Sequence, residues 1–189
     1  MNKEPKTMSE NEELMESRLE QILNDALIKA TDTYSVPPQI IWVDNSTIAT
    51  LGNFSASTGK AKAKKTFNVS ALVAASLSNG TVLNYRACLP EGKRRILYVD
   101  TEQSRYHCHN VLARILKLAG LPTDMDNQNL DFIGLREYTP AIRMEVIDYA
   151  LAHNHGYGLV IIDGIRDLLL DINNAGESVE VINKMMEWS

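Results

Sequence analysis

The chain has 189 residues, 44% of them hydrophobic and 23% charged, which is enough to build the core of one globular domain. Its formal net charge of −5 excludes a protein whose whole surface attracts nucleic acid, so any such contact must come from a local patch. Two cysteines provide no disulfide framework, the N-terminus is not signal-like, and no apolar run is long enough for a bilayer, which favours a cytoplasmic protein with no membrane partner.

Residues 1–34 are predicted to form an acidic N-terminal segment that continues into an amphipathic helix. Ser9 and Glu12 have the S-x-x-E spacing of a capping box. Pro37 and Pro38 cannot continue a helix, so we place a domain boundary before them, with the core over residues 35–189. The helix packs either on its own domain or on a neighbouring subunit, and the sequence leaves both open. Its apolar residues recur at helical spacing: Met15, Leu19, Ile22, Leu23, Ala26, Leu27 and Ala30.

Predicted strands and helices alternate through the core. Apolar strands that alternate with amphipathic helices indicate an α/β fold, with a mainly parallel sheet and helices on both faces. Functional residues of such sheets lie at the carboxyl ends of the strands, and Gly59, Glu102 and Asp163 each follow a predicted strand. The predicted strands are 40–43, 53–58, 95–102, 130–135 and 158–163, and the predicted helices are 67–77, 103–120, 141–152 and 177–188.

Residues 59–66, with the sequence GKAKAKKT, match the phosphate-binding template G-x-x-x-x-G-K-[ST] at Gly59, Lys65 and Thr66. In this register the loop amides and the helix start bind phosphate, Lys65 reaches the β- and γ-phosphates, and the Thr66 hydroxyl holds Mg²⁺. The predicted nucleotide-binding residues are Gly59, Lys60, Ala61, Lys62, Ala63, Lys64, Lys65, Thr66 and Phe67.

The loop departs from the template at Lys64, which replaces the second glycine. That replacement is costly if the position needs a backbone conformation best suited to glycine. A rival register over residues 54–61 keeps Gly59 and Lys60 but loses the first glycine and the hydroxyl. A basic, solvated helix start would have a similar sequence, so the loop needs support from elsewhere in the chain.

Two carboxylates supply that support. Leu159 to Asp163 is an apolar strand that ends in an acid, the form of a Walker B strand whose aspartate holds Mg²⁺. Glu102, at the end of another strand, suits a general base that polarises the attacking water, and Asp100 is a lesser candidate on the same face.

The order of these motifs resembles the RecA-like P-loop ATPase core, most closely the RepA-type replicative helicases, over residues 40–189. The loop is also similar to those of ATPases carried on bacterial mobile elements. The resemblance implies that Glu102 is the catalytic base, that Lys65 is the P-loop lysine acting in catalysis, and that Thr66 and Asp163 hold Mg²⁺. It implies ATP and Mg²⁺ as cofactors, a homo-oligomer (a hexamer), and single-stranded DNA that is unwound or remodelled in plasmid or mobile-element replication.

The same family continues with a further strand and an arginine that acts on a neighbouring nucleotide. This chain stops at Ser189, so we expect a C-terminally truncated core with an exposed sheet edge and an unpartnered final helix. Two other readings stay open: a nucleotide-binding regulatory or assembly module with little hydrolysis, and a non-nucleotide α/β domain with a basic patch. The His107-Cys108-His109 cluster lacks a second cluster at zinc-site spacing and does not predict a metal site.

Overall fold

The computed structural model describes residues 10–59, 64–170 and 175–189, in two compact units, Met1–Val36 and Pro37–Ser189. The first unit contains helix α1 (Glu10–Ala26), and Ser9 of the predicted capping box lies outside the described residues. The apolar side chains of α1 are all exposed, among them Met15, Leu19 and Ile22. Part of the predicted stripe lies on α1, whereas Leu27 and Ala30 follow its last residue, so the helix is shorter than the sequence pattern predicts.

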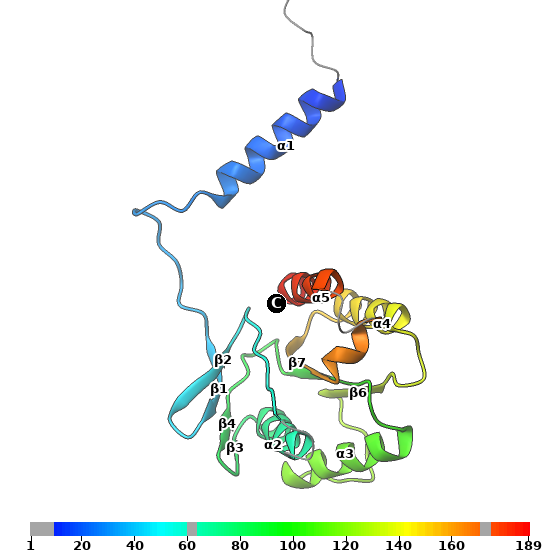
Figure 1. The fold of residues 1–189 in the computed structure, drawn as a ribbon. Coiled ribbons are helices and arrows are strands. Elements are labelled where there is room, and N and C mark those ends of the chain that lie inside the picture. The colour runs from blue at the N-terminus through cyan, green and yellow to red at the C-terminus, as the bar shows by residue number, and fades with distance from the viewer. Residues whose placement is uncertain (1–9, 60–63, 171–174) are drawn as a thin grey trace, which may run out of the picture. The chain divides into compact units, whose positions relative to one another are not determined.

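A three-stranded parallel sheet forms the centre of the second unit, in the order β6–β5–β7 (Figure 1). Strand β5 (Arg95–Asp100) lies between β6 (Leu130–Gly134) and β7 (Tyr157–Asp163). Its apolar run is buried on both faces, as expected for the middle strand of a covered parallel sheet.

Helices cover both faces of this sheet, which confirms the predicted α/β architecture. Ile96 and Tyr98 of β5 pack in one cluster with side chains of two helices, and Leu97 and Val99 pack on the opposite face in a second cluster. In Figure 1, α2 and α3 lie below the sheet, and α4 and α5 lie above it. The helices are α2 (Lys65–Ser78), α3 (Arg105–Leu118), α4 (Pro140–His153) and α5 (Ala175–Trp188).

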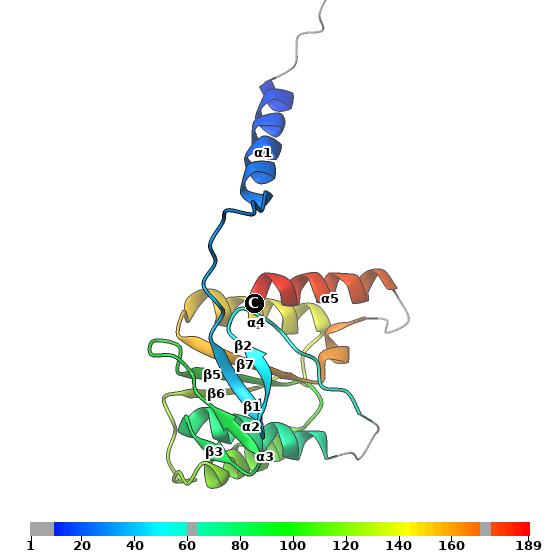
Figure 2. The same ribbon diagram turned by 90° about the vertical axis from the view of Figure 1, so that its left-hand side faces the viewer.

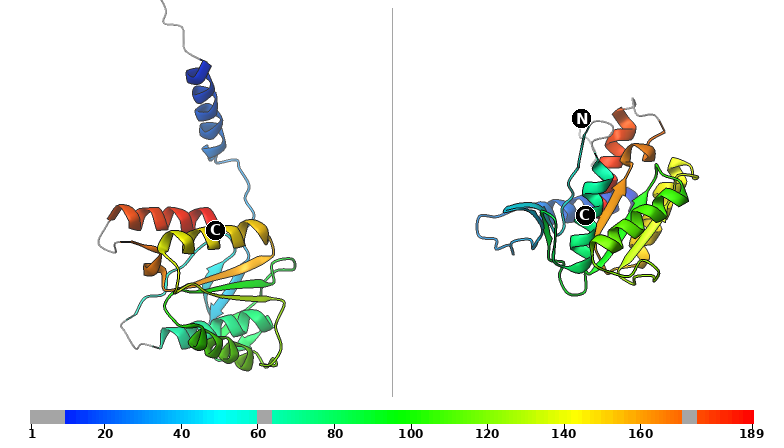
Figure 3. Two further views of the ribbon diagram at one scale, coloured as in Figure 1. Left: turned by 90° about the vertical axis from the view of Figure 1, so that its right-hand side faces the viewer. Right: turned by 90° about the horizontal axis from the view of Figure 1, so that it is seen from below.

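A second, antiparallel sheet was not predicted. Its order is β2–β1–β4–β3, and its buried Ile40 and Ile41 pack in the same cluster as α2, so that α2 separates the two sheets (Figure 3). The predicted strand at 40–43 is confirmed, but its partners come from segments that the sequence pattern did not identify. The strands are β1 (Gln39–Val43), β2 (Ser46–Thr50), β3 (Thr81–Val82) and β4 (Tyr85–Ala87).

The predicted strand at 53–58 is wrong. Residues 53–59 form no strand and are exposed, so among the described residues no strand pairs with the edge of β7 opposite β5. Phe54 is the only large apolar side chain between residues 53 and 58, and it is exposed. One such side chain offers too little burial to offset the entropy of ordering six residues.

The expectation of an unpartnered final helix is also wrong. Helical spacing places Val181, Met185 and Trp188 of α5 on one face, and this face belongs to the cluster that contains Leu97 and Val99. The Trp188 Nε1 donates a hydrogen bond to the Asp148 carboxylate of α4 at 2.7 Å. The contact with α4 therefore fixes α5 on the upper face of the sheet.

Candidate functional site

The first element of the site is the beginning of α2. Lys64, the N-cap residue, has left-handed backbone angles (φ 56°, ψ 30°), and its carbonyl accepts hydrogen bonds from Phe67 N and Asn68 N. This is the conformation that glycine adopts without strain and that other residues adopt at a cost. The concern raised by the missing second glycine is therefore justified by the structure. Four predicted binding residues lie outside the described residues: Lys60, Ala61, Lys62 and Ala63.

Lys65 lies in the first turn of α2, and its side chain extends to Gly59. Its Nζ donates a hydrogen bond to the Gly59 carbonyl oxygen at 3.1 Å, and both residues are exposed. The positive charge of Lys65 and the positive end of the helix dipole both favour an anion near the beginning of α2.

Thr66 joins α2 to the end of β7. Its hydroxyl donates to Asp163 Oδ2 at 3.3 Å, although 97 positions separate the two residues in the chain. The Tyr98 hydroxyl donates to the same carboxylate oxygen at 3.0 Å. Burial raises the pKa of Tyr98, and the charge of Asp163 raises it further, so Tyr98 remains a protonated donor at neutral pH. The Asp163 carboxylate is therefore oriented by two hydroxyl groups.

Asp100 and Glu102 have different roles at the end of β5. Asp100 is fully buried, and its Oδ1 accepts hydrogen bonds from Glu102 N at 3.0 Å and Gln103 N at 2.8 Å. Its Oδ2 accepts from Gln103 Nε2 at 2.7 Å. Asp100 therefore builds the turn after β5, and this turn carries Glu102 out to the surface.

Glu102 lies against the residue that follows Asp163. Gly164 has a φ of +102°, and a Cβ added there would come within 2.8 Å of Glu102 Cγ and 2.1 Å of Thr101 Oγ1. Partial burial raises the pKa of Glu102, and the charges of Asp163, Asp167 and Asp100 raise it further, whereas Lys65 lowers it. The structure thus brings Glu102 into the electrostatic neighbourhood of both Lys65 and Asp163.

The site includes residues that the sequence did not indicate. The Thr101 hydroxyl lies 2.8 Å from Gly164 O and 3.1 Å from Asp167 Oδ2, so it ties the end of β5 to the turn η1 (Ile165–Leu168). Arg143 of α4 donates from Nε to Leu135 O at 3.0 Å and from its terminal nitrogens to the carbonyls of Arg136 and Asp167. The glycine directly after Asp163 is a sequence signal for close packing, whereas the local pattern around Arg143 gives no signal of its contacts.

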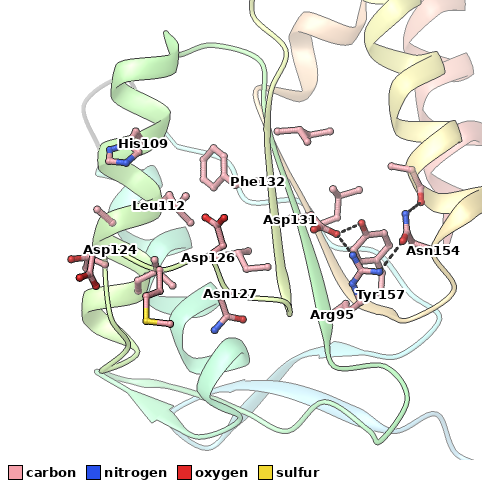
Figure 4. Close-up of a pocket in the computed structure, with 18 residues that line it drawn as sticks. Arg95, His109, Leu112, Asp124, Asp126, Asn127, Asp131, Phe132, Asn154 and Tyr157 are labelled. Atoms are coloured by element: carbon pink, nitrogen blue, oxygen red, sulfur yellow. Dashed lines mark hydrogen bonds and ion pairs between the residues drawn. The ribbon is translucent and has the colours of Figure 1, made fainter.

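The predicted residues that can be placed lie at one edge of the sheet. Figure 2 shows η1 (orange) and the beginning of α2 on the same side, where the carboxyl ends of the parallel strands lie. A hollow of about 750 Å³ lies elsewhere, around β6 (Figure 4). Part of its polar lining is a hydrogen-bonded network of Arg95, Asp131, Tyr157 and Asn154, and Asn154 also donates to the Ala150 carbonyl oxygen. Neither Lys65, Glu102 nor Asp163 lines it.

Across residues 10–59, 64–170 and 175–189, no group of three or more His, Cys, Asp or Glu side chains has a geometry that could hold a metal ion. No helix within those ranges combines the length and apolar character needed to cross a membrane.

Comparison with protein families shows that the family model described as AAA domain matches residues 17–188. The matched range extends from within α1 to the end of α5 and includes all the described site residues. Neither the comparison with curated proteins nor that with solved structures finds a match to the chain.

Proposed function

Because the chain belongs to the AAA domain family of P-loop ATPases, we propose that it binds ATP with Mg²⁺ at the carboxyl edge of its parallel sheet and hydrolyses it. The observation that carries this proposal is the contact between the Thr66 hydroxyl and the Asp163 carboxylate. This contact supports the register over residues 59–66, because the rival register over residues 54–61 has no hydroxyl residue at the position that Thr66 occupies in the template.

The residues fit Mg²⁺. This ion prefers oxygen ligands and is usually held by one or two protein groups together with water and substrate phosphates. Thr66 Oγ1 and Asp163 Oδ2 are such oxygens, on separate elements and 3.3 Å apart. Mg²⁺, when bound, supplies charge neutralisation at the phosphates. In our proposal Thr66 and Asp163 are its protein ligands, with Asp163 acting directly or through water.

The residues also fit a nucleotide phosphate chain. The N-terminus of α2 and the Lys65 ammonium group, which is hydrogen-bonded to the Gly59 carbonyl oxygen, provide positive charge and amide donors in one part of the chain. In our proposal Lys65 exchanges its hydrogen bond with Gly59 O for one with the β- and γ-phosphates. Phe67 and Lys64 contribute backbone groups, and residues 60–63 complete the loop.

Glu102 is proposed as the general base. A base works best when its pKa lies close to the operating pH, and the surroundings of Glu102 raise its pKa toward that range. Gly164 allows the Glu102 side chain to lie next to the end of β7. Glu102 would orient the attacking water and accept its proton, while Lys65 stabilises the negative charge of the phosphate.

We further propose that the core is RecA-like and that hydrolysis drives unwinding or remodelling of DNA by a cytoplasmic homo-oligomer, a hexamer, in plasmid or mobile-element replication. Support comes from the order of the motifs, which resembles RepA-type helicases. The exposed apolar stripe of α1 also supports an oligomer, since Met15, Leu19 and Ile22 on a neighbouring subunit would lose their contact with water.

A second candidate is a regulatory or assembly module that binds ATP with little hydrolysis. The left-handed conformation of Lys64 favours it, because a strained loop weakens the pre-organisation of the phosphate site.

Single-turnover hydrolysis with protein in excess over ATP separates the two candidates. We expect hydrolysis that requires Mg²⁺ and disappears in Lys65→Ala, with Lys117→Ala on the exposed surface of α3 as the matched control. Saturable binding without turnover would favour the regulatory module. Absence of ATP binding by a folded chain would overturn both.

A further inference from the structure

We propose that the open edge of β6, on the side opposite β5, is a docking site for a basic, extended segment of a partner protein. The segment adds to the parallel sheet as a further strand, and the hollow of about 750 Å³ beside β6 receives its side chains. This site is separate from the ATP site and does not depend on ATP binding.

The backbone of β6 has free hydrogen-bonding groups along this edge. Among the described residues, no strand pairs with the outer side of β6. In a parallel sheet the N–H and C=O groups of one residue point to the same neighbour, and successive residues alternate between the two sides. Leu135 N donates to Asp100 O at 2.7 Å, so the odd-numbered residues of this segment face β5. The backbone groups of Phe132 and Gly134 therefore point outward, and they make no hydrogen bond with another described residue.

This edge lacks the features that usually protect an edge strand from pairing. Natural edges carry lysine, proline or a bulge, or are covered by a helix or a loop. The sequence of β6, LDFIG, contains no lysine or proline, and its five residues pair with β5 without a register shift. Its charged residue, Asp131, forms an ion pair with Arg95 at 2.6 Å, so that charge is already compensated. A regular edge of this kind favours the addition of another strand.

The hollow provides apolar walls on both faces of β6. Leu112 of α3 and Phe132 line it on one side, and Ile133 and Ala150 of α4 line it on the other. Figure 4 shows Phe132 on the side of Leu112 and Asp131 on the opposite side of the strand. Successive side chains of an added strand point to opposite faces, so the segment would bury apolar side chains against both walls.

The carboxylates of the hollow favour a basic segment. Asp124 and Asp126, in the loop before β6, are exposed and line the hollow, and neither forms an ion pair with a described basic side chain. The positive charge of Arg95 is paired with Asp131 and does not compensate them. A lysine or arginine at the end of the segment that lies beside this loop would complement the two carboxylates.

The same charges disfavour the N-terminal unit of a second copy as the occupant. Tyr34 and Val36 are exposed and stand at alternate positions in a segment that is neither helix nor strand. However, α1, which precedes them, carries six carboxylates and one arginine, so Asp124 and Asp126 would repel it. The occupant that fits the edge is therefore a different, basic protein.

Fluorescence anisotropy of the full chain with a labelled peptide tests the charge requirement. The probe has six alternating valine and threonine residues with a lysine at each end. We expect saturable binding that becomes about two- to thirty-fold weaker in the variant Asp124→Asn with Asp126→Asn, because two exposed ion pairs are lost. The control, Glu91→Gln with Glu145→Gln, removes two exposed carboxylates outside the hollow and should bind as the wild type does. No binding by the folded wild type, or equal loss in both variants, would overturn the proposal.

Two N-methylated forms of the peptide test the backbone pairing. Methylating every second amide removes the N–H groups on one side of the peptide strand, and methylating the alternate set removes those on the other side. An added strand needs only the N–H groups that face β6, so one form should bind at least about ten-fold more weakly and the other should keep most of its affinity. Equal effects of the two forms would overturn strand addition.

Amide hydrogen exchange, measured by NMR, tests the position of the peptide. In the chain alone, the amides of Phe132 and Gly134 should exchange faster than that of Ile133, which faces β5. Saturating peptide should slow the exchange of Phe132 and Gly134 at least about ten-fold. Protection elsewhere in the chain, without protection of these two amides, would overturn the site. Protection of both amides in the chain alone, increasing with protein concentration, would assign the edge to a second copy instead.

The variants leave Phe132 unchanged so that the ATP site is not disturbed. Its ring stacks on that of Tyr98, with 4.4 Å between centroids, and the Tyr98 hydroxyl donates to Asp163. Calorimetry with ATP on the same samples should give equal affinity for the wild type and the Asp124 and Asp126 variant. Absence of ATP binding in the wild type would contradict the proposed function and leave the β6 site standing, whereas loss of ATP binding in the aspartate variant alone would contradict the separation of the two sites.

Discussion

The two edges of the parallel sheet differ in how their charged side chains are arranged. At the amino edge, Arg95 and Asp131 form an ion pair at 2.6 Å, Tyr157 donates to the same carboxylate, and Asn154 accepts from Arg95. Burial and the hydrogen bond to Asp131 raise the pKa of Tyr157 to about 12, so it remains a donor. Arg95 Nε is buried without a partner among the described residues, and Asn154 Nδ2 donates to the Ala150 carbonyl oxygen at 3.1 Å (Figure 4).

At the carboxyl edge, like charges face one another instead. Asp100, Asp163 and Asp167 all raise the pKa of Glu102, and Lys65 only partly offsets them. The backbone is also unusual there, with φ of 56° at Lys64 and 102° at Gly164. Opposite charges that pair with each other stabilise a fold, whereas like charges beside the strained backbone of Lys64 are typical of a functional site.

Glu102→Gln should produce the largest change and should act on hydrolysis alone. Removing a general base typically lowers the rate by about 100- to 10,000-fold, while ATP binding should stay within about two-fold of wild type. Glu137→Gln, on the next loop, is the control and should hydrolyse ATP normally. Turnover by the Glu102 variant at the wild-type rate would remove Glu102 from the role of base.

Gly164→Ala should damage both stability and hydrolysis at the carboxyl edge. The new Cβ would come too close to Thr101 Oγ1 and Glu102 Cγ, and the alanine backbone would have to keep a positive φ. Together these effects should lower the free energy of unfolding by about 2–4 kcal/mol. Urea unfolding measures this loss. Gly120→Ala is the matched control, because Gly120 also has a positive φ (71°) but no neighbour within 4 Å, so its cost should be limited to about 1–2 kcal/mol. Equal losses in the two variants would refute the close packing at Gly164.

Asp131→Ala should affect the amino edge alone. It leaves Arg95 without its ion pair and Tyr157 without its acceptor, which should lower the free energy of unfolding by about 1–2 kcal/mol. Tyr157→Phe removes only the hydroxyl and should cost about half as much. ATP affinity should not change in either variant, and a change would show that the two edges are coupled.

Lys64→Gly should stabilise the protein by about 0.5–1 kcal/mol, because glycine adopts the left-handed conformation without strain. The greater entropy of glycine in the unfolded chain offsets part of this gain. ATP affinity should stay the same or rise. Leu83→Gly relieves a similar conformation (φ 54°) far from the site along the chain, so it controls for stability alone. A large loss of affinity in Lys64→Gly alone would mean that the Lys64 side chain is itself a ligand.

The pH dependence of Glu102 is the smallest effect that we expect. Its pKa in the folded protein is raised above the ordinary value of 4.5, so hydrolysis should increase with pH through a midpoint above 4.5. Because the folded state holds this proton more tightly than the unfolded state, the contribution of Glu102 to stability is present at low pH and is lost as pH rises from 4.5 through the raised pKa. Glu102→Gln should remove that slope from the unfolding free energy, and an unchanged slope would assign it to other groups.

Local sequence patterns predicted the helices, the parallel strands and the residues that meet at the carboxyl edge. Thr66, Glu102 and Asp163 were predictable because each follows from a motif beside a strand or helix end. Arg143 and the pair of Arg95 and Asp131 were not, because their partners lie far away in the chain and depend on the packing of whole elements. The strand predicted at 53–58 was wrong because the local pattern alternates as in a strand, but the segment has too little apolar surface to stabilise one.

Calorimetric titration of ATP with Mg²⁺ into the wild type, Lys65→Ala and Lys60→Ala tests most directly whether the carboxyl edge is a nucleotide site. We predict saturable binding by the wild type, a loss of at least about ten-fold (1.4 kcal/mol) in Lys65→Ala, and a smaller loss in Lys60→Ala. Equal binding by the wild type and Lys65→Ala, with both chains folded, would contradict the assignment of this edge. A loss in Lys60→Ala as large as that in Lys65→Ala would instead support the rival register of the loop.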